Sequence, residues 1–205
     1  MPETPSIKGS VLAGHAEVLL KYLASHPIDP KVLARRFPDD EMKLLSQPLS
    51  KGAWYDIRIY QRVLEFLRDY PGEQNNAYLL DAGRRSAEAL IRSGFYQQME
   101  YVGRTQLKEH KDPVARFQAF GRDLRLLTTL ALSIFNFVKS RVLVDPEHPD
   151  RWIIEYDCSA PFPEVLCWTT EGFCNRMAEE HGTPELWQWR KLRPDLVQYR
   201  MRYPV

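Results

Sequence analysis

Hydrophobic residues recur at helical spacing from the start of the chain to about residue 137. In the first segment Leu12, Leu19 and Leu23 fall seven and four residues apart, which places them on one face of a helix. The pair Pro71-Gly72 is a stop signal that would end a later helix. The pattern predicts helices over residues 11–23, 30–37, 39–45, 55–70, 76–93, 95–102 and 113–137.

Beyond residue 137 apolar and polar side chains alternate, which is typical of half-buried strands. Strands are expected at residues 138–144, 152–158, 186–192 and 196–203, with a helix at 164–180 between the two pairs. We therefore predict an α+β fold in which N-terminal helices pack on a C-terminal four-stranded antiparallel sheet with strand-strand-helix-strand-strand order. Residues 1–205 form a single domain in this prediction, with a helical part at about 10–137 and a sheet part at about 138–204.

The charge balance and the cysteine count narrow the classes of partner and compartment. The 28 basic and 27 acidic residues leave a formal net charge of +1, so a nucleic-acid partner or an anionic membrane surface is not expected. The longest apolar stretch, residues 124–137, is interrupted by polar residues and is shorter than the roughly 20 residues that a membrane span needs. Three cysteines and no readable secretory signal predict a cytoplasmic protein without a disulfide framework.

Several short strings and the order of the predicted elements carry a resemblance to a known superfamily. The strings are Ile7-Lys-Gly-Ser-Val11, Trp54-Tyr55, Ile134-Phe-Asn-Phe137, the helix around residues 165–177 and the last strand at 197–203. Over about residues 7–203 the chain resembles the superfamily of vinyl-reductase-like sensor domains, haem nitric-oxide-binding domains and transport-particle (TRAPP) subunits. It is most similar to an uncharacterised paralogous family expanded in myxobacteria. The resemblance implies a domain that encloses a small-molecule pocket or packs a partner subunit, and neither branch implies catalysis.

Two departures from this superfamily concern bound cofactors. The haem-binding branch combines an axial histidine with a Tyr-x-Ser-x-Arg motif that binds the propionates. The nearest string here, Val138-Lys-Ser-Arg141, lacks the tyrosine, so haem is not expected. Some phenol-responsive sensor members bind zinc through cysteines near the end of the domain, and this chain has no Cys-x-x-Cys pair to match them. No cofactor and no metal site are therefore assigned.

The cysteines Cys158, Cys167 and Cys174 are the sharpest candidates for metal or redox chemistry. Cys167 and Cys174 lie seven residues apart, about 10 Å along a helix, which is too far for two thiolates to share a zinc ion comfortably. A four-ligand site would also have to recruit His181. Free cysteine is among the most buried residue types, so core packing is the preferred interpretation and a metal or redox role is the alternative.

The sequence offers no motif for catalysis or nucleotide binding. The five histidines have no Ser, Cys or Asp partner at the spacing of a known nucleophile motif, and no Gly-rich phosphate loop occurs. Glu155 and Asp157 share a strand face, where a solvated, salt-bridged surface explains them better than acid–base catalysis. We therefore do not expect an enzyme. Either a solvated outer face or a local cationic patch would explain the strand arginines Arg141, Arg190, Arg200 and Arg202.

Aromatic residues of the sheet and its helices are the candidates for a binding site. Most will be core, because aromatic side chains dominate core burial, but pockets are lined by the same residue types. We predict a non-catalytic sensor or regulatory domain that binds a small apolar ligand between helices and sheet, shifts its conformation and signals to a partner protein. The alternative is an interaction or scaffold module that forms a homodimer and binds a partner without a ligand. The predicted ligand-binding residues are Phe135, Trp152, Tyr156, Trp168 and Phe173.

Overall fold

The computed structural model describes residues 4–93 and 112–205. The helix predicted at 95–102 and His110 lie outside the described residues. The chain divides into two compact units, Met1–Tyr78 with Ser133–Phe137 and Leu79–Leu132 with Val138–Val205, which are described separately. The single domain over the whole chain stays a prediction. Within the described ranges, no helix is long and apolar enough to cross a membrane.

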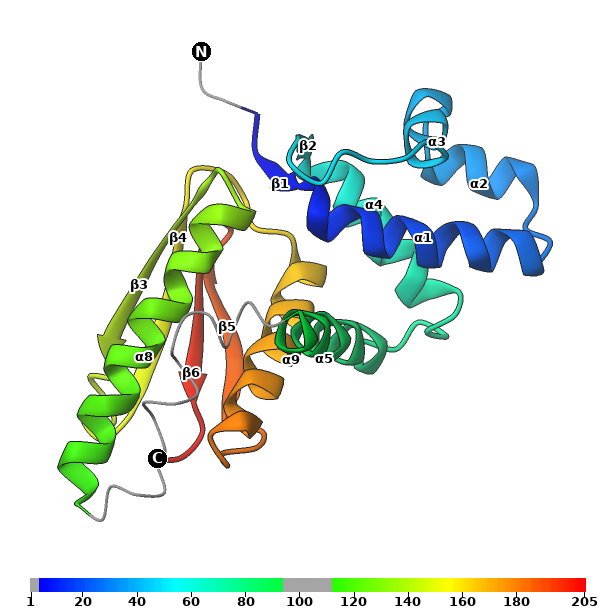
Figure 1. Ribbon diagram of the computed structural model, residues 1–205. Coiled ribbons are helices and arrows are strands. Elements are labelled where there is room, and N and C mark those ends of the chain that lie inside the picture. The colour runs from blue at the N-terminus through cyan, green and yellow to red at the C-terminus, as the bar shows by residue number, and fades with distance from the viewer. Residues whose placement is uncertain (1–3, 94–111) are drawn as a thin grey trace. The chain divides into compact units, whose positions relative to one another are not determined.

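Two helices and a pair of short strands organise the first unit (Figure 1). Its elements are β1 (Ser6–Lys8), α1 (Gly9–Ser25), α2 (Pro30–Arg36), α3 (Asp39–Leu45), β2 (Trp54–Asp56) and α4 (Ile57–Asp69). Strand pairing places Ile7 opposite Tyr55, and β2 leads directly into α4, so the helix predicted at 55–70 begins only at residue 57. Helix α1 packs on α4, and Leu12, Leu19 and Val63 are fully buried there.

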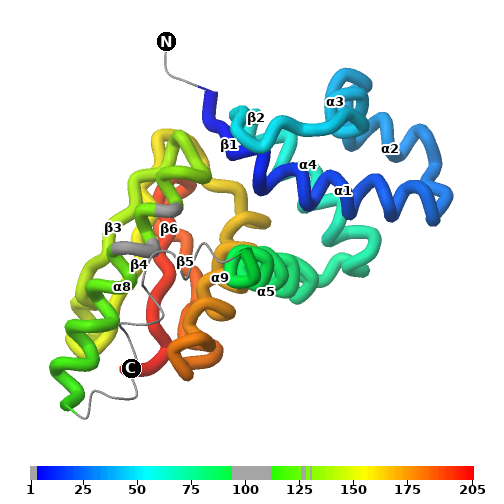
Figure 2. Tube along the Cα trace, in the orientation of Figure 1, coloured from blue at the N-terminus to red at the C-terminus, as the bar shows by residue number. Residues whose placement is uncertain are grey.

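The second unit is a four-stranded antiparallel sheet with helices packed on it (Figures 1 and 2). Its elements are α5 (Ala77–Arg92), α8 (Pro113–Ile134), β3 (Val138–Val144), β4 (Trp152–Cys158), α9 (Glu164–Glu180), β5 (Trp187–Arg193) and β6 (Leu196–Met201). The strand order is β3-β4-β6-β5, and each neighbouring pair is antiparallel. The predicted α+β class and strand-strand-helix-strand-strand order are therefore confirmed. Strands β3 and β4 and helix α9 begin and end at the predicted residues.

Alternation along the strands separates an inner face, which meets the helices, from a polar outer face. On the inner face Trp152 of β4 is buried, and its indole stacks on Phe117 of α8 with ring centroids 4.5 Å apart. Helix α9 lies against β5 on the same side. On the outer face Arg141 of β3 binds Glu155 of β4 at 2.8 Å. The core of this unit therefore lies between the sheet and helices α8 and α9.

Helices α5 and α9 cross so closely that only glycine fits at the contact. A Cβ atom on Gly83 would lie 1.9 Å from the carbonyl oxygen of Thr169, and one on Gly172 would lie 2.0 Å from the carbonyl oxygen of Leu80. Both oxygens belong to the backbone, so they cannot turn aside as a flexible side chain could. The two glycines therefore set the distance between the helices, and a movement of α9 must carry α5 with it or break this packing.

Candidate ligand-binding site

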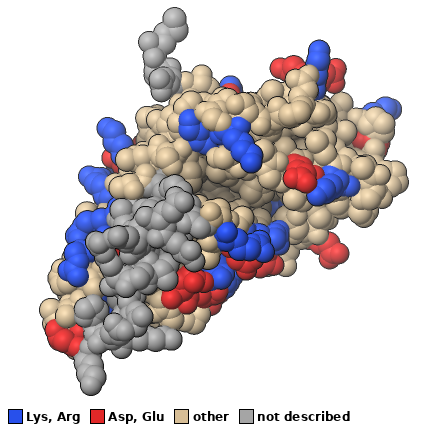
Figure 3. Space-filling view, in the orientation of Figure 1, with Lys and Arg blue, Asp and Glu red and all other residues tan. Residues whose placement is uncertain are grey.

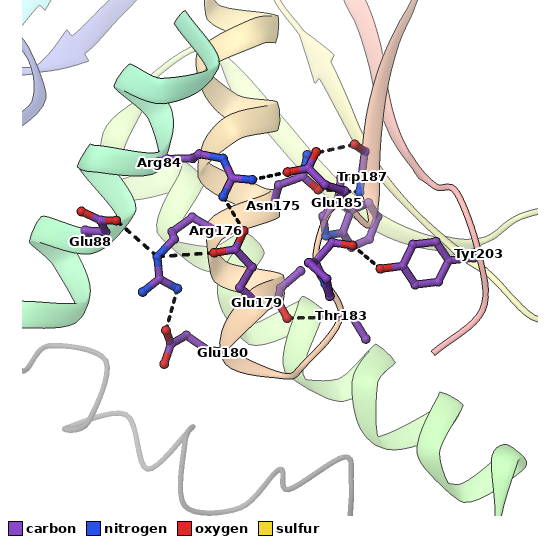
Figure 4. Close-up of polar contacts among 12 residues, drawn as sticks. Arg84, Glu88, Asn175, Arg176, Glu179, Glu180, Thr183, Glu185, Trp187 and Tyr203 are labelled. Atoms are coloured by element: carbon purple, nitrogen blue, oxygen red, sulfur yellow. Dashed lines mark hydrogen bonds and ion pairs between the residues drawn. The ribbon is translucent and has the colours of Figure 1, made fainter. Parts of the chain in front are cut away.

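Helix α9 holds the edge of strand β5 through side-chain hydrogen bonds to the strand backbone. The Asn175 amide donates to the carbonyl oxygen of Trp187 at 3.1 Å and accepts from its N–H at 2.7 Å (Figure 4). Glu171, one turn earlier, accepts from the N–H of Trp189 at 2.7 Å. Asn175 and Glu171 are only 2% and 3% exposed, so these bonds are shielded from water. We call these two side chains the edge clamp, because they satisfy backbone groups that an edge strand otherwise leaves unpaired.

The indoles of Trp168 on α9 and Trp189 on β5 pack edge to face next to the edge clamp. Their ring centroids are 5.2 Å apart and their planes make an angle of 87°. Both side chains are half-buried, and both Nε1–H groups are buried without a hydrogen-bond partner. A buried donor without an acceptor costs about 1–3 kcal/mol. The tryptophan pair therefore offers two unpaired N–H donors on apolar rings, which a hydrogen-bond acceptor would satisfy.

Glu171 sets the charge next to the tryptophan pair. Burial raises the pKa of its carboxyl group, while the hydrogen bond from the Trp189 N–H and the Arg202 guanidinium, 3.4 Å away, act in the opposite direction. The carboxyl group thus binds a proton more readily than a solvated glutamate does. Because its oxygen already accepts from the strand backbone, its role in the site is to position β5 and to set the local charge.

The three cysteines have the properties of packed core residues. Burial raises the pKa of Cys158, Cys167 and Cys174 to about 12. A thiol with so high a pKa carries almost no thiolate at neutral pH, and the thiolate is the nucleophile and metal ligand. Among the described residues, no group of three or more His, Cys, Asp or Glu side chains is placed to hold a metal ion. These observations favour the packing interpretation over a metal or redox role.

Two of the five predicted ligand-binding residues have the contacts of core residues. Trp152 is 2% exposed, and its Nε1–H donates to the carbonyl oxygen of Phe117 at 3.1 Å, so its donor is already satisfied. Tyr156 contacts the rings of Phe162 and Tyr199 at centroid distances of 5.8 and 5.3 Å. Both residues therefore help to fill the space between the sheet and its helices.

The other three predicted residues are divided between the two units. Phe135 belongs to the first unit, where its backbone pairs with Ile7 and its ring contacts Phe137. Phe173 packs against buried side chains of α5 and α9. Trp168 is the one member of the predicted set that belongs to the tryptophan pair described above.

The predicted set of ligand-binding residues did not include Trp189, Glu171 or Asn175. Alternation does place Trp187 and Trp189 on one strand face, and this was the readable signal. It does not reveal that β5 lies at the edge of the sheet, because strand order is decided by tertiary pairing. Glu171 and Asn175 stand four residues apart, the spacing of one helix face, so two polar residues on a largely buried helix could have marked the edge clamp.

Ion pairs fix the C-terminal half of α9 to α5. Arg84 of α5 pairs with Glu179 of α9 (Figure 4). Arg176 of α9 binds Glu180 at 2.6 Å and lies 3.6 Å from Glu88 of α5. Figure 3 shows basic and acidic side chains next to one another on this part of the surface. Partly exposed surface pairs contribute about 0–1 kcal/mol each, so the role of these pairs is to orient α9 on α5.

Strand arginines on the outer face are paired with carboxylates. Arg141 lies 2.8 Å from Glu155 and 3.6 Å from Asp157. Arg200 binds the buried carboxylate of Asp145 at 2.6 Å. These contacts favour a salt-bridged face over a cationic patch for Arg141 and Arg200, and over acid–base catalysis for Glu155 and Asp157, although the face is not solvated at Asp145 and Glu155, which are buried.

Comparison with known proteins identifies the fold. No family model and no curated protein matches the chain. An H-NOX protein from K. algicida, in its unliganded Fe(II) form, matches with a TM-score of 0.56 and 12% identity over 95% of each chain. A single-substitution variant of that protein matches with a TM-score of 0.55 at the same identity and coverage. The chain has the H-NOX fold.

The chain thus shares the fold of one branch of the superfamily that it resembles, the haem nitric-oxide-binding branch, and the likeness reaches no further than the fold. At 12% identity the likeness carries no function with it. The vinyl-reductase-like, transport-particle and myxobacterial assignments are finer than this likeness and stay predictions.

The residues at 138–142 of this H-NOX fold do not assemble a propionate-binding motif. Val138 stands where the motif has tyrosine, and the Ser140 hydroxyl donates to the carbonyl oxygen of Thr128 at 2.9 Å. Consecutive strand residues face opposite sides of a sheet, so Arg141 lies on the outer face and Val142 follows Ser140 on the inner face. These side chains do not fit a haem.

Proposed function

We propose that this chain is a non-catalytic sensor or regulatory domain that binds a small apolar ligand against Trp168 and Trp189 and signals to a partner protein. The observation that carries the proposal is the pair of buried indole N–H groups without an acceptor. The shared fold is consistent with ligand binding, since the K. algicida H-NOX protein of this fold carries Fe(II) and is in an unliganded form. A non-catalytic role agrees with the high pKa of the three thiols, which leaves them poor nucleophiles.

The chemistry of the tryptophan pair defines the preferred ligand. Two indole rings supply apolar contact area, and their N–H groups supply hydrogen bonds to an acceptor. Glu171, which binds the backbone of Trp189, disfavours an anionic ligand at this place whenever it is ionised. The ligand class is therefore a small neutral molecule with an apolar body and at least one acceptor, such as an aromatic ketone.

Binding at the tryptophan pair can be transmitted through α9. Trp168, Glu171 and Asn175 follow one another along one face of the helix, so a ligand that separates the indoles also strains the edge clamp. Two states follow, with the clamp closed or open, and the ligand shifts their populations by its difference in affinity. The close crossing at Gly83 and Gly172 passes a displacement of α9 to α5, where a partner protein can detect it.

Trp168 is thus the predicted ligand-binding residue that the proposal retains. For Trp152, Tyr156, Phe173 and Phe135 the contacts described above favour roles in packing, and ligand contact remains a prediction. Haem is not part of the proposal, because residues 138–142 do not fit its propionates.

Ligand-observed NMR titrations with acetophenone and ethylbenzene test this function. The two probes are similar in size, but only the ketone carries an acceptor, so it should bind about tenfold more tightly. Trp168→Phe and Trp189→Phe should each reduce this ratio, because each removes one of the unpaired donors. Trp54→Phe, at an exposed position of the first unit, is the matched control and should leave the ratio unchanged. Equal affinities for the two probes would refute the proposed site.

The alternative function, an interaction module that dimerises without a ligand, is favoured by a separate observation. Among the strands that the structure describes, none lies beside the β3 edge of the sheet in the second unit, and the exposed side chains at the end of β3 are apolar.

A further inference from the structure

The two edge strands of the four-stranded sheet differ in whether side chains of the second unit bind their outward-facing backbone groups. Of the described strands, β5 and β3 form the edges (Figure 1). At β5 the edge clamp binds the backbone of Trp187 and Trp189, and the register is irregular between Lys191 and Arg193. Covering side chains and bulges are the means by which proteins prevent a strand edge from pairing with another chain. The β5 edge is therefore closed.

At the β3 edge, the N–H and C=O groups of the even-numbered residues of the strand point away from β4. The N–H of Trp152 on β4 points to the Sδ of Met201 on β6. Backbone groups of successive strand residues point to opposite sides, so the even-numbered residues of β4 direct their N–H and C=O groups toward β6 and the odd-numbered residues direct theirs toward β3. The N–H of Asp145, just after β3, likewise donates inward to Arg151 at 2.9 Å. By alternation, the amides and carbonyls of Ser140, Val142 and Val144 point away from the sheet.

The side chains at the end of β3 are apolar and accessible. Leu143 is 38% exposed on the outer face, and Val144 is 46% exposed on the inner face. The charge of Arg141 is already balanced by Glu155. Within residues 4–93 and 112–205, β3 is a seven-residue edge strand with an apolar end and no clamp like the one at β5, and such a strand is a template for an added strand.

The side-chain sequence of β3 selects a second copy of itself as the added strand. An antiparallel pair centred on Val142 sets Ser140 opposite Val144 and Arg141 opposite Leu143 of the second copy. A pair centred on Arg141 would place the Arg141 side chains of the two copies opposite each other. A pair centred on Ser140 would place Lys139 of one copy opposite Arg141 of the other. A centre at Leu143 would pair only the last three residues of the strand. The centre at Val142 is thus the longest register without opposed like charges.

We infer that two copies of this chain associate through antiparallel pairing of their β3 strands, with the two-fold axis at Val142. The two sheets become one continuous sheet, and the open edge of each is closed by the other. Because β3 and β5 are opposite edges of the sheet, this interface leaves the tryptophan pair free.

Charge variants at Leu143 test the register. Its side chain lies opposite Arg141 of the second copy, so Leu143→Glu should tighten the dimer and Leu143→Lys should weaken it, with about a tenfold or greater difference in dimer dissociation constant. Leu192→Glu and Leu192→Lys are matched controls, since Leu192 is 43% exposed on β5, and they should leave the constant unchanged. Sedimentation equilibrium over a range of protein concentrations measures all five proteins. A wild-type chain that is monomeric at every concentration, or a dimer that responds only at Leu192, would overturn the inference.

Disulfide trapping checks the two-fold axis independently of affinity. Residues that face each other in a hydrogen-bonded antiparallel pair have Cα atoms about 5.5 Å apart, within disulfide reach. Val142→Cys should therefore form a covalent dimer under mild oxidation. Val144→Cys is the control, because residue 144 and its copy would lie roughly 13 Å apart along the strands, so this variant should stay monomeric. The native thiols do not interfere, since burial raises the pKa of each to about 12. Equal trapping of the two variants, or trapping of neither, would contradict the register.

Discussion

Asn175→Ala is the most direct perturbation of the edge clamp. The Asn175 amide makes two hydrogen bonds to Trp187, at 2.7 and 3.1 Å, and both residues are only 2% exposed. Alanine removes both bonds and leaves the N–H and the carbonyl group of Trp187 buried without their partners. Each unsatisfied backbone group costs about 1–3 kcal/mol, so the expected loss in unfolding free energy for the two groups is about 2–6 kcal/mol.

Urea unfolding followed by tryptophan fluorescence measures this loss. Four of the five tryptophans lie in the second unit, so the signal reports mainly on the part of the chain that the change affects. For a chain of this size the same loss lowers the melting temperature by about 2–4 °C per kcal/mol. Gln188→Ala, at an exposed position of the same strand, is the control and should change stability by less than about 0.5 kcal/mol. A loss below about 1 kcal/mol for Asn175→Ala would refute the argument, because water or a shifted strand would then satisfy Trp187.

Three further predictions concern the helix crossing, the buried carboxyl group and the thiols. Gly83→Ala should destabilise the fold by at least about 1–3 kcal/mol in thermal unfolding, because its Cβ would lie 1.9 Å from the carbonyl oxygen of Thr169. Gly14→Ala meets nothing within 4 Å in α1 and should stabilise by about 0.5–1 kcal/mol. Because burial raises the pKa of Glu171 above 4.5, the folded state holds this proton more tightly than the unfolded state. The free energy of unfolding of the wild type, relative to that of Glu171→Gln, should therefore fall as the pH rises from below 4.5 through the raised pKa of Glu171. Urea unfolding at several pH values measures this difference, and a difference that does not change with pH would contradict the prediction. The three cysteines, with pKa values raised to about 12, should react with a thiol reagent at pH 8 far more slowly in the folded than in the urea-unfolded chain.

The sheet of the second unit was readable from the sequence, because its signals are local. Strict alternation over residues 138–144 and 152–158, with a proline-containing turn between them, fixed both strands to the residue. Helix α9 was predicted with its observed bounds because Pro163 precedes it and Gly182 follows it. Proline before a helix and glycine after it mark the helix ends through their own backbone preferences, so these signals can be read from the sequence alone.

Elements whose ends are set by contacts between segments far apart in the sequence could not be predicted from the sequence. Strands β1 and β2 are three residues long, too short for a period, and exist because Ile7 pairs with Tyr55. Helix α8 was predicted to reach residue 137 but ends at Ile134. It ends there because the N–H of Asn136 donates to the carbonyl oxygen of Ser6 at 3.2 Å. Both outcomes depend on segments that are far apart in sequence and meet only in the folded unit.

The candidate site was predicted only in part, for the same reason. Aromatic residues at strand and helix positions pointed to Trp168, but sequence spacing alone gave no reason to join it to Trp189. Trp152 and Trp168 differ in whether the indole N–H finds a hydrogen-bond acceptor. The Nε1–H of Trp152 finds the carbonyl oxygen of Phe117, and that of Trp168 finds none. That difference follows from packing and leaves no mark on residue type or spacing.

Native mass spectrometry of the protein purified from its own host tests the central claim most directly. The account predicts a stoichiometric neutral adduct of low mass, which a denaturing run releases as a small apolar molecule with a hydrogen-bond acceptor. Trp168→Phe should lower the occupancy of that adduct, since it removes one of the two unpaired donors. A chain or a dimer that carries no small molecule would contradict the sensor function and leave the interaction module as the better account.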